Sequence, residues 1–126
     1  MRVRLTIDGQ HATATLADNP TARDFASLLP ITVPMRDLFD REKPGPLTRA
    51  LDDGGEHEFR YEIGQLAYWP PEHEIAIFYA EAGPSIPSPG IIPLGTIDAG
   101  LDTITGASDE FAMTIEATSG QPYPAS

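Results

Sequence analysis

The sequence contains no cysteine, and this absence excludes a disulfide-stabilised scaffold, thiol catalysis and cysteine-based zinc sites. It also contains no hydrophobic run near the roughly 18 residues that a membrane-spanning helix requires. The N-terminal residues lack the apolar segment of a signal peptide. From these absences we expect a soluble protein located in the cytoplasm.

Basic residues are few in this chain. Its 126 residues include 8 Lys and Arg against 19 Asp and Glu, which gives a formal net charge of −11. This charge repels nucleic acid and anionic membrane surfaces, so we expect neither as a partner. If a peptide or small molecule binds, it is expected to be neutral or basic.

Length and hydrophobic content indicate one folded domain. A chain of 126 residues is typical of a single domain, and 40% hydrophobic residues is too many for a disordered chain. Apolar patterns that can form a core continue almost to residue 118, so we expect the domain to span residues 1–118. Residues 119–126 have no such pattern and are expected to form a flexible C-terminal tail.

The clearest local signals lie near the N-terminus. In residues 1–17, apolar and polar residues alternate on both sides of an Asp-Gly pair, which favours a tight hairpin turn. Asn19 can cap a helix that begins at Pro20, and Pro30 disfavours helical geometry in the residue before it. We therefore predict a β-hairpin followed by a helix over residues 20–29.

The remaining residues contain short β-like runs separated by loops. Residues 30–55 show loop chemistry at 43–46 and 52–55, and Pro34 either ends a strand or marks an edge strand. A second, short helix is predicted near residues 100–105. Further strands are predicted at residues 31–33, 59–63, 66–69, 75–79, 94–97 and 111–115. So many short strands favour an all-β barrel or sandwich, and a barrel leaves fewer exposed edges.

Four motifs occur together along the chain. They are Asn-Pro-Thr-Ala at 19–22 with Phe25, Gly-Gln-Leu-Ala-Tyr-Trp at 64–69, Ala-Ile-Phe-Tyr at 76–79 and Pro-Leu-Gly-Thr-Ile at 93–97. In this order they resemble the small bacterial cyclophilin-like domain family over residues 1–118. The resemblance implies a closed antiparallel barrel of eight strands with two helices over its ends. It implies no activity, because members share the scaffold of prolyl isomerases without a generally agreed function.

The motifs of true cyclophilins are mostly missing. Those enzymes have a His-Arg pair with Phe five residues after the Arg, whereas here Arg36 lacks the His and Phe39 follows only three residues later. Their Gln-Gly-Gly-Asp segment is matched only loosely by Gly64-Gln65. Their ligand-contacting Trp has no counterpart, since Trp69 lies elsewhere in the order. The resemblance therefore implies the scaffold without most of the catalytic set.

Arg36 is the candidate catalytic residue for prolyl isomerisation. The reaction needs an apolar pocket for the proline ring and a donor that favours the twisted amide, whose rotation barrier is ~18–20 kcal/mol. Arg36 supplies the donor, and Phe39, Phe78 or Tyr79 supplies a pocket wall. In the alternative interpretation, Arg36 pairs with a neighbouring aspartate on the surface and the aromatic side chains form the barrel core. The candidate partners in that alternative are Asp37 and Asp40.

Aromatic side chains are also candidates for ligand binding. A groove between the end of the 66–69 strand and the Pro-rich loop at 85–89 could hold a peptide or small molecule, because Tyr and Trp usually keep a polar atom near water. In the alternative interpretation these side chains fill the barrel interior and its rim. The candidate ligand-binding residues are Phe39, Tyr68, Trp69, Phe78 and Tyr79.

Three function classes remain open. The first is a cyclophilin-like binding domain with a partly aromatic groove, the second is a divergent prolyl isomerase, and the third is a structural or interaction protein with a filled groove. No cofactor and no metal site are expected. His57 and His73 are flanked by glutamates that would point to the opposite face of a strand, so those neighbours cannot share a metal with them.

Overall fold

The N-terminal hairpin forms where the sequence predicts it. β1 (Arg2–Ile7) pairs antiparallel with β2 (Gln10–Leu16), and Asp8 and Gly9 both have positive φ in the turn between them. Positive φ at two successive turn residues matches the twist of the flanking strands. The apolar faces of both strands are buried, so the hairpin forms one wall of the core.

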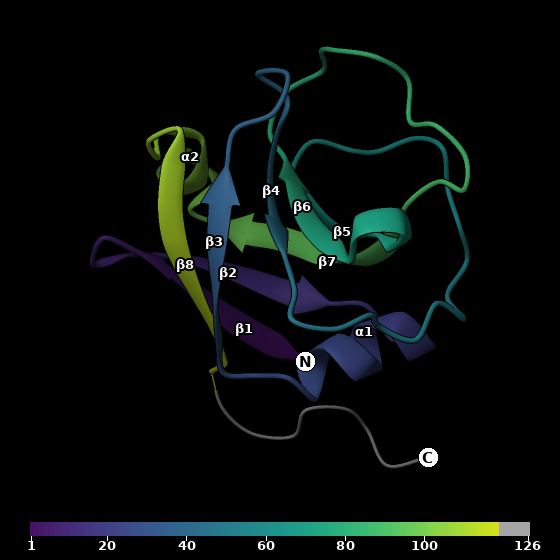
Figure 1. Ribbon diagram of the computed structural model, residues 1–126. Helices are drawn as coiled ribbons and strands as arrows, with labels where there is room; N and C mark the ends of the chain where they lie inside the picture. Colours follow the sequence, from purple (N-terminus) through teal and green to yellow (C-terminus); the bar gives the residue numbers. More distant parts are fainter. Residues whose placement is uncertain (119–126) are drawn as a thin grey trace.

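The computed structural model describes residues 1–118, and the tail predicted at residues 119–126 lies outside them. The further elements after the first helix are β3 (Ile31–Arg36), β4 (Glu42–Pro46), β5 (Gln65–Trp69), the 3-10 helix η1 (Pro70–Glu72), β6 (Glu74–Phe78), β7 (Ile92–Ala99), α2 (Leu101–Thr105) and β8 (Glu110–Ala117). Eight antiparallel strands form one sheet in the order β3-β8-β1-β2-β7-β5-β6-β4, curled into a nearly closed barrel (Figure 1). This architecture confirms the predicted barrel.

The first helix, α1 (Pro20–Ala26), is shorter than the predicted helix over residues 20–29. It begins as expected, because the Asn19 side chain accepts a backbone N–H at 2.8 Å. Its end tightens, since the N–H groups of residues 28–29 bond to carbonyls three residues earlier, not four. Pro30 disfavours α geometry in the residue before it, so the regular helix stops early.

β4 is a strand where the sequence predicts a loop. The prediction for residues 43–46 is wrong, because this Pro-rich segment pairs with β6 along its length. β4 is the last strand of the sheet, so only one of its edges pairs with a neighbouring strand, β6. Pro44 and Pro46 lack their N–H groups on the other edge, where no strand needs a backbone donor. β3, at the other end of the sheet, continues through Pro34, which confirms the edge-strand alternative for that residue.

Residues 59–63 do not form the predicted strand. Phe59 and Ile63 are more than half exposed, whereas the Tyr61 ring stacks on Phe78 with centroids 4.2 Å apart. An extended segment with no neighbouring strand cannot form a ladder, whatever its alternation. The apolar residues of this segment therefore contribute to the surface, with one ring packed inward.

The barrel comes together where β3 and β4, the two ends of the sheet, face each other (Figure 1). Gly45 allows this approach. A Cβ at this position would lie 2.4 Å from Met35 Sδ, 2.6 Å from the Pro34 carbonyl oxygen and 2.7 Å from Val33 Cγ1. The seam between β3 and β4 therefore depends on the absence of a side chain at residue 45.

Replacing Gly45 with Ala is expected to lower the free energy of unfolding by roughly 1–3 kcal/mol, because the added methyl group overpacks the seam. Chemical denaturation measures this change. Gly9→Asn is the matched control, since a Cβ at Gly9 meets nothing within 4 Å and Asn tolerates positive φ. Equal stability of Gly45→Ala and the wild type would contradict the close seam.

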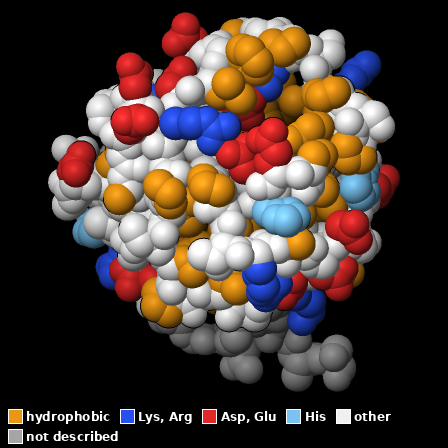
Figure 2. All heavy atoms as spheres, viewed as in Figure 1, with side chains coloured by type: hydrophobic (Ala, Val, Ile, Leu, Met, Phe, Trp, Pro, Cys, Tyr) orange, Lys and Arg blue, Asp and Glu red, His pale blue; other side chains and the backbone are white. Residues whose placement is uncertain are grey.

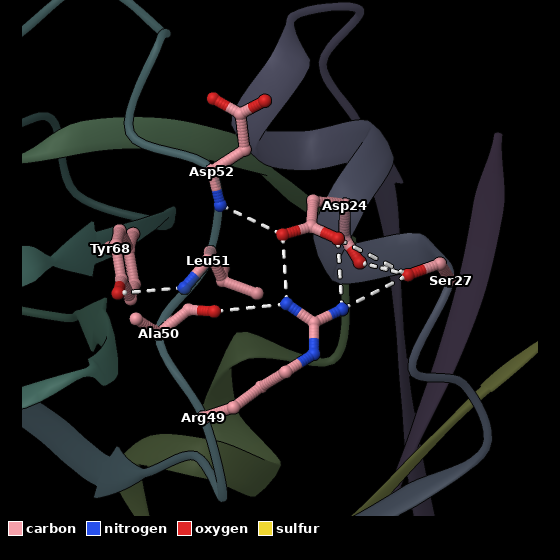
Figure 3. A network of polar contacts seen from close by, with 7 residues as sticks. All are labelled: Asp24, Ser27, Arg49, Ala50, Leu51, Asp52 and Tyr68. Atoms are coloured by element: carbon pink, nitrogen blue, oxygen red, sulfur yellow. Dashed lines mark hydrogen bonds and ion pairs between the residues drawn. The ribbon is translucent and has the colours of Figure 1, made fainter.

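Residues 47–55 form a strap across α1, and Asp24 on that helix is its anchor (Figure 3). Arg49 donates to both carboxylate oxygens of Asp24, at 2.8 and 2.9 Å. The backbone N–H of Asp52 donates to Asp24 Oδ2 at 2.7 Å. These donors, Arg49 first and Asp52 next, lower the pKa of Asp24 from 3.8 to about 2.

Stability at acid pH is expected to report on this strap. Because the folded-state pKa of Asp24 lies below its unfolded value, its contribution is complete above about pH 4 and is lost as the pH falls toward 2. Asp24→Asn should lower the free energy of unfolding by about 1 kcal/mol at neutral pH, a figure discounted for solvent screening. Denaturation at several pH values measures the difference, which should shrink near pH 2.

The control for this prediction is Asp53→Asn, which changes an exposed side chain close to the strap anchor. Its stability should follow that of the wild type within about 0.5 kcal/mol at each pH. If the deficit of Asp24→Asn stays constant down to about pH 2, the residue acts through packing and not through its charge.

Candidate functional site

A pocket of about 190 Å³ opens beside the seam, among the ends of β3, β4 and β6 and the loop before β7. Figure 2 shows this face, where hydrophobic side chains surround a hollow that has acidic and basic side chains at its edge. We call it the aromatic pocket. Its apolar wall is formed by Phe39, Trp69, Ala76, Phe78, Ile86 and Ile91.

Arg36, at the end of β3, lines the aromatic pocket and keeps 41% of its side chain exposed. Its Nη1 donates to Glu74 Oε2 at 2.6 Å and its Nη2 to Glu74 Oε1 at 3.3 Å. The hydrogen bond to Glu74 raises the pKa of Arg36 above its ordinary value. The structure therefore pairs Arg36 with Glu74, and not with Asp37 or Asp40.

Arg41 is buried and contributes to the lining of the aromatic pocket. Its guanidinium donates to the Glu42 carboxylate and to the Pro84 carbonyl. Its Cζ lies 5.2, 5.5 and 5.6 Å from the ring centroids of three aromatic side chains, Phe39, Tyr61 and Phe78. Arg41 therefore contacts the aromatic wall, the loop at residue 84 and β4 at once. It holds these parts in position relative to one another, which is a positioning role.

Glu42 is an acidic group in a largely apolar setting. Only 8% of its side chain is exposed, and it lines the same pocket. Burial raises the pKa of Glu42, although the hydrogen bond from Arg41 works in the opposite direction. The pocket therefore combines an apolar wall with a carboxylate whose charge is costly to keep.

Phe39 has a backbone conformation that most residues avoid. In the tight turn between β3 and β4, Phe39 has a φ of 61° and Asp40 a φ of 50°, and the N–H of Arg41 bonds to the Leu38 carbonyl at 3.1 Å. The Phe39 side chain is 50% exposed at the pocket. A Cβ at Gly83 would come within 2.9 Å of Phe39 Cβ, so Gly83 leaves room for it. An exposed ring held in a costly conformation indicates a role for the ring.

Phe39→Asn is expected to raise the free energy of unfolding by about 1 kcal/mol, because positive φ costs less conformational energy for Asn than for Phe. Thermal or chemical denaturation measures the change. Asp40→Asn is the control, since both residues accept this conformation, and its effect should be small. A destabilised Phe39→Asn would mean that the packing of the ring outweighs the backbone strain.

The structure brings four of the six predicted site residues to the aromatic pocket. Arg36, Phe39, Trp69 and Phe78 all line it. Trp69 and the loop residue Ile86 face the same cavity, which is where the sequence places a groove between the 66–69 strand and the 85–89 loop.

The two other predicted residues, Tyr68 and Tyr79, do not line this pocket. Tyr68 is 1% exposed in the core, where its hydroxyl accepts the N–H of Leu51 at 3.0 Å. The Tyr79 hydroxyl donates to Asp37. Burial and the Asp37 carboxylate raise the pKa of Tyr79 above its ordinary 10.0. Both hydroxyls therefore have structural partners.

Sequence reasoning missed the charged lining of the pocket. Arg41 and Glu42 precede the segment at 43–46, and with β4 unrecognised they belong to a loop of no assigned role. Glu74 entered the sequence argument only as a neighbour of His73. The signal that could have found them is the charge pair Arg41-Glu42 at the start of an edge strand.

Metal binding and membrane insertion can be assessed for residues 1–118. Within this range, no three His, Asp or Glu side chains lie close enough together to hold a metal ion. His11 and His57 are hydrogen-bonded instead, to the Thr6 hydroxyl at 3.0 Å and to the Pro89 carbonyl at 2.9 Å. No helix in the described part of the chain is long and apolar enough to cross a membrane.

Comparison with known proteins agrees with this barrel. A family model described as the cyclophilin-like family matches residues 5–116. The solution structure of a hypothetical protein from Archaeoglobus fulgidus is similar, with a TM-score of 0.75 and 22% identity over 92% of this chain and 93% of that one. A likeness at this identity shows the fold alone. No curated protein matches the chain.

Proposed function

This chain belongs to the cyclophilin-like family, and we propose that its aromatic pocket binds one apolar residue of a neutral or basic peptide, or a small molecule of that size. The observation that carries the proposal is an exposed guanidinium beside an apolar concavity. The net charge of −11 favours a neutral or basic ligand over an acidic one. A cytoplasmic location, which the sequence favours, belongs to the same proposal.

The size of the pocket supports a small ligand or a single side chain. A volume of about 190 Å³ is below the roughly 300–1,000 Å³ of cavities that hold drug-sized molecules. Trp69 and Phe39 offer apolar ring surface to the bound group, and the buried Phe78 lies beneath the wall. Arg36 has five N–H groups and shares two of its nitrogens with Glu74, so further N–H groups can donate to a ligand carbonyl.

The position of Arg36 also favours a second candidate function, prolyl isomerisation. A proline ring would lie against the apolar wall while Arg36 donates to the amide as its double-bond character is lost. Glu74 neutralises the guanidinium, so we expect this activity to be weak. An open pocket gives less support to an interaction protein with a filled groove.

Binding of N-acetylated X-Pro tetrapeptides tests the main proposal, with the fluorescence of Trp69, the one Trp of the chain, as the signal. Ala76→Leu adds volume inside the pocket and is expected to weaken binding at least roughly tenfold. Ile63→Ala, at an exposed residue outside the pocket, is the control and should bind as the wild type does.

Two results would overturn this proposal. Unchanged affinity of Ala76→Leu would place binding elsewhere, and no binding of any peptide would favour a filled, structural groove. The same peptides distinguish the second candidate, because uncatalysed isomerisation takes tens of seconds and even weak acceleration is visible. Acceleration that Arg36→Ala abolishes would support catalysis, whereas no acceleration would leave binding alone.

A further inference from the structure

We infer that the aromatic pocket selects a ligand with an ammonium group, which the Glu42 carboxylate receives while Arg36 donates to a carbonyl of the same ligand. This inference rests on the proposed function and names its ligand class. The class is an α-amino carbonyl compound with an apolar body, such as an amino-acid amide or the N-terminal residue of a peptide.

The first support is an unpartnered oxygen of a buried side chain. Glu42 is 6% exposed, and its Oε1 accepts the only hydrogen bond that its carboxylate receives from residues 1–118. Its Oε2 has no hydrogen-bond partner in this range. This oxygen is not fully buried, because Arg41 Nε is the one fully buried side-chain N or O atom without a partner there. Since Glu42 lines the aromatic pocket, we assign the exposure of Oε2 to the pocket, where this oxygen can accept a donor from a ligand.

The second support is the charge of the pocket lining. Two arginines, Arg36 and Arg41, face three glutamates, Glu42, Glu72 and Glu74, and 2 − 3 gives −1. One bound monocation makes the lining neutral. The overall charge of −11 draws a cation toward the molecule as well.

The third support is the chemistry of the apolar wall. Aromatic faces attract cations, and Trp provides the strongest attraction of the three aromatic residue types. Phe39 is half exposed and Trp69 is half-buried at this wall, whereas Phe78 is buried beneath it. An ammonium-bearing ligand can therefore place its apolar body on the rings and still find favourable electrostatics there.

The fourth support is the donor at the mouth of the pocket. Arg36 lies close enough for its charge to act on Glu42, and both line a cavity of about 190 Å³. Glu42 and Arg36 thus offer an acceptor and a donor within one small cavity. An ammonium and a carbonyl on adjacent carbons supply the complementary donor and acceptor.

The charged groups that face Glu42 set the pH dependence of binding. They are Arg41, Arg36 and Glu74. Burial raises the pKa of Glu42, so ammonium binding should weaken as the pH falls through the acid range and Glu42 takes up a proton.

A matched pair of probes tests the inference. Prolinamide and cyclopentanecarboxamide have the same shape, but only prolinamide carries an ammonium at about pH 7. Titration of the wild type, followed by Trp69 fluorescence, is expected to show at least roughly tenfold tighter binding of prolinamide. In Glu42→Gln, whose amide oxygen can still accept from Arg41, this preference should disappear while the neutral probe binds as before.

Glu62→Gln removes the same charge at an exposed residue outside the pocket and should keep the preference for prolinamide. Equal affinity of the two probes for the wild type would overturn the inference and leave the proposed function standing. No binding of either probe would overturn the inference, and the N-acetylated X-Pro tetrapeptides would then decide the proposed function. If Glu42→Gln fails to fold, the wild-type comparison and its loss of preference at acid pH decide the question.

Discussion

The two ends of the sheet meet without a backbone ladder in the part of the chain that the structure describes. The β3–β4 turn and the aromatic pocket beside it both depend on this constraint. The facing edge strands carry Pro34, Pro44 and Pro46, and proline has no N–H to donate. A side-chain ion pair joins β4 to the residue directly after β3, with Lys43 Nζ 3.2 Å from Asp37 Oδ1. Edges closed in this way also offer few free donors to another chain.

Charged side chains at the seam between β3 and β4 are stable only when each has its hydrogen-bond and ion-pair partners. Burial alone would raise the pKa of Asp37, but hydrogen bonds from Tyr79 and Lys43 outweigh it and lower the pKa. Lys43 Nζ also lies 3.3 Å from the Ala107 carbonyl and near the rings of Tyr79 and Phe111. This satisfied cluster holds the start of the β3–β4 turn in place, and the aromatic pocket lies directly beside that turn.

Local sequence patterns predicted those parts of the fold whose causes are local. The Asp-Gly turn and the Asn19 cap require only neighbouring residues, so the hairpin and the start of α1 were predictable. β4 was not, because Pro44 is acceptable in a strand only if that strand has one free edge, which is a property of the whole sheet. The pattern at 59–63 failed for the opposite reason, since it has no strand to pair with.

In the candidate site, too, local patterns predicted some residues and missed others. Aromatic composition led to Phe39, Trp69 and Phe78, but it could not separate them from Tyr68, which packs in the main core and not with the residues around the pocket. The charges of the lining were beyond local reasoning, since Arg36 and Glu74 are 38 residues apart in the chain.

A barrel does not need these charges. A groove filled by apolar side chains would avoid the desolvation of Glu42, and Gly or Asn at residue 39 would avoid the cost of the positive φ of Phe39. Both residues lie on the turn or strand that borders the same cavity, so the two costs fall on one site. A buried charge and a strained backbone residue beside one cavity are typical of a binding site and not of a closed core. The architecture of the aromatic pocket thus favours ligand recognition over a purely structural barrel.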